Sequence, residues 1–226
     1  MSRSPFIKKI VSNYNSKSAI RSWLKSLKTP PASSGRVLIT ALRNPTWIEW
    51  GVYCAAVVRL MGYESTILYK GSEVGKFYPS LFFNFWKSAK LVPGIELIDL
   101  EELDYDSTIY QKYFDASLKP AIAALAYNFH IESEDILEND DIYGSQLLEL
   151  RKESAINGAR INRLLSKNKY HQFICYSGII WDTPLLLRGA LDADHDVVCV
   201  EGWAWRPGHM IYNFAAPALE YNVKGW

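Results

Sequence analysis

The chain has 226 residues, a formal net charge of +1 and 49% hydrophobic side chains, which is typical of a globular protein. This composition excludes a disordered chain, a collagen and a coiled coil, and no run of 18 apolar residues predicts a membrane-spanning helix. The three cysteines, Cys54, Cys175 and Cys199, are far apart, so they predict neither a disulfide framework nor a metal knuckle. We therefore expect a cytoplasmic protein.

The N-terminal segment, residues 1–28, is basic and amphipathic. Residues 1–36 carry eight Lys and Arg and no acidic residue, whereas the other 190 residues carry 17 basic and 24 acidic side chains, a net charge of −7. Apolar residues recur at helical spacing within the segment. Three interpretations stay open: a helix packed on its own domain, a helix lying on an anionic membrane surface at the inner face through residues 3–28, and a transit peptide. Residues 29–35 are typical of a linker.

From residue 36 onward the pattern alternates between strands and helices. A strand at 36–42, a helix at 47–61 that ends at Gly62, and a strand at 64–69 predict a right-handed βαβ unit with parallel strands. A third strand is predicted at 95–99. A stretch at 101–141 follows, with acidic residues at both ends and a predicted helix near 108–128.

The second half continues the same alternation. An amphipathic helix is predicted at 144–168, a strand at 172–176, a helix at 182–191 and a strand at 197–200. This order predicts one Rossmann-like α/β domain over 36–226, with a doubly wound, mostly parallel sheet, helices on both faces and a helical insertion.

Common catalytic motifs are absent from the chain. It has no GxGxxG, no P-loop, no HExxH and no GxSxG, which disfavours a dinucleotide dehydrogenase, a P-loop NTPase, a zincin and a serine hydrolase. The acidic cluster from Asp192 to Asp196 lies between a helix end and a strand start. Ligands of open α/β sheets bind at the opposite, carboxyl edge, so we interpret the cluster as a solvated turn. We expect no metal, no cofactor and no nucleic-acid partner.

The carboxyl ends of three predicted strands are followed by loops with polar and aromatic side chains. The residues that we single out there are Arg43, Asn44, Trp47 and Glu49 after the first strand, Ser177, Gly178 and Asp182 after the fourth, and Glu201, Trp203, Arg206 and His209 after the last. If these strands are parallel, the three loops meet at one edge. Aromatic faces cover the apolar faces of sugars, and charged groups bind hydroxyls or phosphate, so the pattern predicts a site for a sugar or sugar phosphate.

Each of these residues also has a structural interpretation. The tryptophans can pack against a second domain, Glu201 can pair with Arg206, and Asp182 can serve as the N-cap of the helix that follows it.

The last fifty residues carry a resemblance to a known family. The stretch from Glu201 to Asn213 (EGWAWRPGHMIYN), followed by Pro217-Ala218 and Glu220-Tyr221-Asn222, resembles bacterial glycosyltransferases of capsular and surface-polysaccharide synthesis, as does Tyr176-Ser177-Gly178 before a helix. The resemblance implies the GT-B architecture, in which two Rossmann-like domains face a cleft. The N-terminal domain mostly binds the acceptor and the C-terminal domain binds the nucleotide-sugar donor.

The chain departs from that family because it contains no donor domain. We therefore expect either the acceptor-side half of a longer enzyme, completed by a C-terminal donor domain or a partner subunit, or a free-standing one-domain relative. The resemblance implies transfer without a bound metal, with Glu201 as general base and His209 as the second candidate. Arg206 or the amides after Gly178 would hold a phosphate or carboxylate of a glycan or lipid-linked acceptor.

Two further functions compete with the transferase. One is a non-catalytic Rossmann-like module that binds a glycan or a phosphorylated ligand. The other is an interaction domain that docks a partner through its tryptophan-rich rim, with the basic segment as an anchor.

Overall fold

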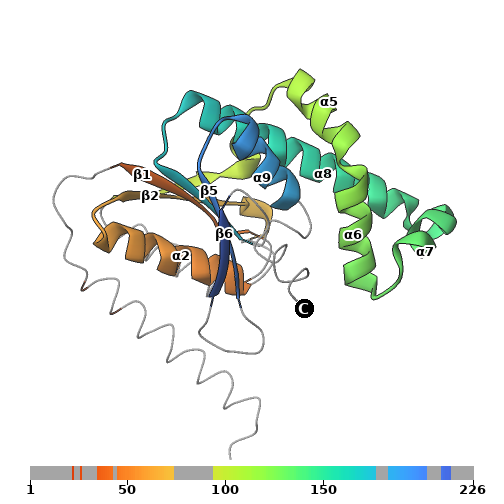
Figure 1. The fold of residues 1–226 in the computed structure, drawn as a ribbon, viewed down its shortest axis with the longest axis horizontal. Coiled ribbons are helices and arrows are strands. Elements are labelled where there is room, and N and C mark those ends of the chain that lie inside the picture. Colours follow the sequence, from red (N-terminus) through yellow and green to blue (C-terminus); the bar gives the residue numbers. More distant parts are fainter. Residues whose placement is uncertain are drawn as a thin grey trace, which may run out of the picture. The chain divides into compact units, whose positions relative to one another are not determined.

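The computed structural model describes Ser22, Ser26 and residues 35–42, 45–73, 94–176, 183–202 and 210–214; the side chains of 43–49, 53, 128, 201–202 and 210–214 are not described. Apart from the two serines and Gly35, the predicted N-terminal helix and linker lie outside the described residues. The chain divides into two compact units, Met1–Asp99 and Leu100–Trp226, and each is described by itself (Figure 1).

The first unit contains the predicted βαβ arrangement. Strand β1 (Arg36–Thr40) is followed by helix α2 (Pro45–Leu60), strand β2 (Glu64–Tyr69) and strand β3 (Ile95–Asp99). Strand β2 pairs in parallel with both β1 and β3. The residues from Val37 to Thr40 are all buried, as expected for a parallel strand that is covered on both faces.

Helix α2 runs alongside β1 and β2 (Figure 1). Pro45 is its first residue, a position where the missing N–H costs nothing. Helix α2 approaches the end of β1 so closely that a Cβ added at Gly51 would lie 2.6 Å from the Cβ of Ala41. Gly62, just after the helix, has a φ of +91° and gives the left-handed termination that its sequence predicts.

The second unit begins with five helices before its first strand. They are the 3₁₀ helix η1 (Leu100–Glu102), α5 (Ser107–Ala116), α6 (Leu118–Phe129), α7 (Ser133–Glu138) and α8 (Asp140–Lys167). The single helix predicted near 108–128 is therefore wrong, because the chain breaks at Ser117. The Ser117 hydroxyl donates to the Phe114 carbonyl at 2.6 Å and accepts from Arg151 Nε at 3.1 Å, which fixes the break from a distant helix. Helix α8 starts four residues before the predicted 144.

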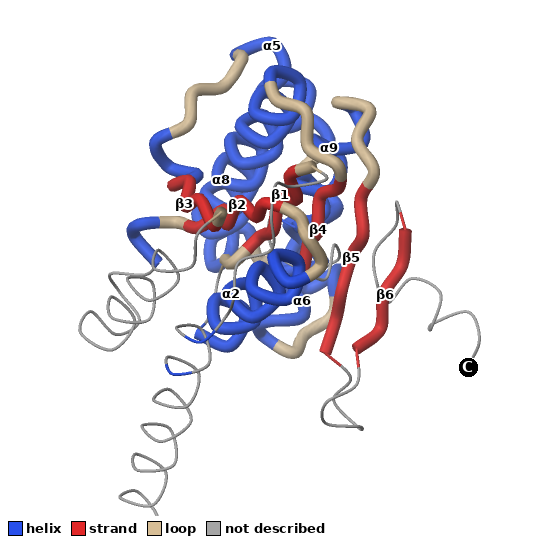
Figure 2. The backbone as a smooth tube through the Cα atoms, turned by 90° about the vertical axis from the view of Figure 1, so that its left-hand side faces the viewer, coloured by secondary structure: helices blue, strands red, loops and turns tan. Residues whose placement is uncertain are grey.

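Helix α8 is long enough to take part in two separate cores. Its N-terminal half, through Leu150, packs with α6 and α7 around Ile122, Leu125 and Ile136. Its middle, through Ala155 and Ala159, packs with α5 and with α9 (Thr183–Asp192). Figure 2 shows α8 extending behind the strands of this unit.

Three strands complete the second unit. Strand β4 (Gln172–Tyr176) pairs in parallel with β5 (Val197–Gly202), and β5 pairs antiparallel with β6 (Met210–Phe214), which the sequence did not lead us to expect (Figure 2). The predicted Rossmann-like α/β fold with mostly parallel strands is confirmed, since five of the six described strands lie in parallel pairs. That 36–226 forms one domain stays a prediction. Within the described residues, no helix has the length and apolarity needed to cross a membrane.

Candidate functional site

Most of the predicted site residues fall outside the described part of the chain. This holds for Arg43, Asn44, Ser177, Gly178, Asp182, Trp203, Arg206 and His209. Only the backbone is described for Trp47 and Glu49, which lie in the first turns of α2, and for Glu201, which lies in β5. For Trp47, Glu49 and Glu201 the structure therefore gives the backbone position alone.

The carboxyl ends of β4 and β5 lie next to each other. Their parallel register pairs Tyr176, the last residue of β4, with Val200. Glu201 is the next residue of β5, and Ser177 is the next residue of the chain after β4. Since neighbouring strands are about 5 Å apart, Tyr176 and Val200, which directly precede Ser177 and Glu201 in the sequence, lie side by side.

Strand β6 pairs with the carboxyl end of β5. Glu201 pairs with Ile211, and Gly202 pairs with Met210. The sequence analysis did not predict β6. The strands that precede the second and third predicted stretches, β4 and β5, therefore end side by side. That residues 43–50 meet these stretches stays a prediction.

The first unit has its own polar group at a carboxyl edge, which the sequence analysis missed. Lys70 directly follows β2, and its side chain is only 3% exposed. Its Nζ lies 3.7 Å from Oε1 of Glu73, whose side chain is 13% exposed. At the end of β3, Asp99 Oδ1 accepts a hydrogen bond from the Gly71 amide at 3.2 Å. The sequence shows a lysine immediately after an apolar strand, but the burial of its side chain depends on the elements that cover it.

These contacts favour a structural role for the Lys70 group. A buried ammonium is stable only when an opposite charge pairs with it, and Glu73 supplies that charge. Asp99 ties the end of β3 to the turn that follows β2, so its carboxylate is occupied as well. We therefore place the candidate site at the β4–β5–β6 edge.

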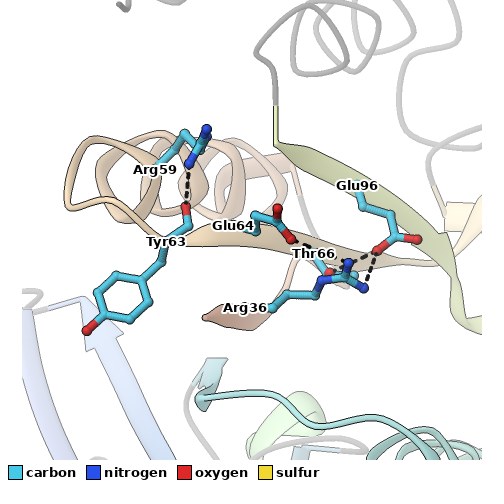
Figure 3. Close-up of polar contacts among 6 residues, drawn as sticks. All are labelled: Arg36, Arg59, Tyr63, Glu64, Thr66 and Glu96. Atoms are coloured by element: carbon cyan, nitrogen blue, oxygen red, sulfur yellow. Dashed lines mark hydrogen bonds and ion pairs between the residues drawn. The ribbon is translucent and has the colours of Figure 1, made fainter. Parts of the chain in front are cut away.

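The amino edge of the first unit carries an ion-pair network (Figure 3). Arg36, at the start of β1, lies 3.4 Å from Glu64 Oε2 on β2 and 3.3 Å from Glu96 Oε2 on β3. The Thr66 hydroxyl also donates to Glu96, at 3.2 Å. The three charged side chains are about half exposed, so the network joins three strands without forming an enclosed site.

Asp192, the first residue of the acidic cluster between α9 and β5, forms two ion pairs. The Asp192 carboxylate lies 2.7 Å from Lys112 Nζ and 2.8 Å from Arg188 Nε, and it accepts from the Tyr113 hydroxyl at 3.0 Å. Burial raises the pKa of Asp192, but the hydrogen bonds from Lys112 and Tyr113 and the charge of Arg188 outweigh it, so the pKa lies below its ordinary value. Burial first, and then the bond to Asp192, raise the pKa of Tyr113.

Asp192 thus joins α5 to α9, while Asp194 and Asp196 of the same cluster are exposed. Within the described ranges, no three His, Cys, Asp or Glu side chains are grouped in a way that could hold a metal ion. Glu201 stands near the carboxyl end of the parallel strand β5. Such a carboxylate can accept a proton from a hydroxyl that binds at this edge.

Comparisons of the chain with protein-family models, with curated proteins and with solved structures found no match.

Proposed function

We propose that this chain is the acceptor-side domain of a GT-B type glycosyltransferase of surface-polysaccharide or capsule synthesis. In this proposal it binds a glycan or lipid-linked acceptor at the β4–β5–β6 edge, and Glu201 takes the proton from the acceptor hydroxyl. The sugar comes from a nucleotide-sugar donor held by a C-terminal domain or a partner subunit.

One observation carries the proposal. Glu201 lies at the carboxyl end of β5, and β5 is paired on both sides, with β4 in parallel and with β6 antiparallel. A general base must stay within reach of the proton that it removes, and a strand bonded on two sides holds its residues more firmly than a loop does. The stretches that follow β4 and β5 in the sequence contain the polar and aromatic residues that a saccharide site needs.

The basic segment 3–28 carries seven Lys and Arg and no acidic residue. One interpretation of it is a peripheral position at the anionic inner face of a membrane, where a lipid-linked acceptor would be found. The transferase proposal does not require this position.

The test compares Glu201→Gln with Glu96→Gln in the intact enzyme, each against a panel of nucleotide sugars, with products detected by mass spectrometry. Glu96 is the matched control because it is a carboxylate near the amino end of a strand, β3, whereas Glu201 lies near the carboxyl end of β5. We expect Glu201→Gln to abolish transfer and to spare donor binding, and Glu96→Gln to keep transfer. Near-normal transfer by Glu201→Gln would remove Glu201 from this role, and His209→Asn would then be tested as the second candidate. If the wild-type protein binds glycans but forms no product with any donor, it is a binding module instead.

A further inference from the structure

The far end of the second unit is a small helical arm with its own core. We define the arm as residues 118–150, which comprise α6, α7 and α8 up to Leu150. Its core is formed by small and aliphatic side chains from all three helices: Ala121, Ile122, Ala124, Leu125, Ile136 and Leu150. Figure 1 shows these helices grouped at one end of α8. The arm belongs to none of the edges considered for the site.

The surface of the arm is strongly acidic. Residues 118–150 contain seven acidic residues and one basic residue, Lys119. All seven acidic residues are exposed: Glu132, Glu134, Asp135, Glu138, Asp140, Asp141 and Glu149. A strongly acidic surface attracts a basic partner over roughly a Debye length, about 10 Å at 0.1 M salt.

The same surface exposes large apolar side chains between the carboxylates. Tyr127 is 62% exposed, Leu137 and Ile142 are each 57% exposed, and Phe129 is 44% exposed. Along one face of α8, an open depression of about 420 Å³ is lined by Asp140, Gly144, Ser145, Leu147, Leu148 and Arg151. Apolar anchors among charges of one sign are the features by which a surface receives an amphipathic helix of the opposite charge.

We propose that this arm docks the basic amphipathic segment, residues 3–28, of a second copy of this chain. The segment carries seven basic residues against the seven acidic residues of the arm, and it has no acidic residue of its own. Its apolar residues, among them Phe6, Trp23 and Leu27, recur at helical spacing and match the exposed apolar side chains of the arm. The charges steer the encounter, set its direction and make the affinity depend on salt, and the apolar contacts add to that affinity.

A second copy accounts for both surfaces at once. When each chain gives its segment to the other's arm, the two contacts are identical and close a twofold dimer. The second contact then forms within an existing complex, at a high effective concentration, so that two weak contacts give one stable assembly. This inference does not depend on the transferase activity.

The experiment measures the mass of the full chain by sedimentation velocity in low and high salt. The arm variant replaces three exposed carboxylates, Glu134→Lys, Glu138→Lys and Glu149→Lys. The segment variant replaces Lys9→Glu, Lys17→Glu and Lys25→Glu. The control replaces three exposed carboxylates of the same unit outside the arm: Glu101→Lys, Glu102→Lys and Asp115→Lys. Circular dichroism checks that each variant is folded.

We expect the wild type and the control to form dimers that dissociate in high salt, and each of the other two variants to be monomeric. An equimolar mixture of the arm and segment variants should restore the dimer, because one contact is then wild type and the other has both charges reversed. A monomeric wild type overturns the proposal, as does a dimer that survives both variants. So does binding of the segment to anionic phosphatidylglycerol vesicles without any self-association, because the occupant would then be a membrane.

Discussion

The substitution Gly158→Ala tests how closely α8 and α9 approach each other. A Cβ at Gly158 would lie 2.8 Å from the backbone carbonyl oxygen of Leu185 and 3.0 Å from Cδ2 of Tyr113. The Leu185 oxygen belongs to the first turn of α9, so it cannot move unless the helix shifts. Tyr113 is only 1% exposed and lies in the same core.

Two opposing effects determine how much Gly158→Ala changes the free energy of unfolding. Overpacking of a core by one methyl group costs about 1–3 kcal/mol. Alanine is favoured over glycine within a helix by about 1 kcal/mol, which offsets part of that cost. Because the clashing atom is a backbone oxygen, we expect the upper part of the packing range, about 2–3 kcal/mol. Gly158→Ala should then lower the free energy of unfolding by about 1–2 kcal/mol, and Tm by roughly 2–8 °C for a chain of this length.

Gly144→Ala is the matched control, because it is the same change in the same helix. The added Cβ would contact only the carboxylate of Asp140, the end of an exposed side chain that can rotate away. We therefore expect stabilisation by about 0.5–1 kcal/mol. Urea denaturation followed by circular dichroism measures both variants. The reasoning is refuted if Gly158→Ala is as stable as the wild type, or if both substitutions change stability in the same direction.

Three further predictions concern charged and titratable side chains. Asp192→Asn should destabilise the protein at neutral pH. Because the pKa of Asp192 is lowered in the folded state, the loss should shrink as the pH falls below roughly 4; urea titrations at both pH values test this, and a pH-independent loss would contradict it. Lys70→Met should cost more than about 2 kcal/mol because it leaves the largely buried Glu73 without this partner. Arg36→Met, at a half-exposed network, should cost less than about 1 kcal/mol; equal losses in parallel urea titrations would refute the distinction. Burial raises the pKa of the Cys54 thiol to about 12, so iodoacetamide should alkylate it slowly until urea unfolds the chain, as peptide mass spectrometry would show; rapid labelling of the native protein would count against this.

The candidate site could be predicted only in part. The carboxyl-edge rule led to Glu201 and to the stretch that begins at Ser177, and the register of β4 and β5 puts the residues that precede them, Val200 and Tyr176, side by side. The sequence analysis missed the Lys70–Glu73 pair because it selected the tryptophan-rich loops and not the residues that follow β2. No local pattern distinguishes a lysine that enters the protein from one that points into water; that depends on which elements cover it.

Local signals were enough to determine most elements of the fold. The strands at 64–69, 95–99 and 172–176 have the predicted bounds, because short apolar runs bounded by turn residues are a property of the sequence itself. Gly62 ends α2 for the same local reason. Only the tertiary structure decided the break at Ser117, where Arg151 arrives from 34 residues away, and the addition of β6 to the edge of β5. A strand and a helix break of this kind depend on partners distant in sequence, and such partners are defined only once the chain has folded.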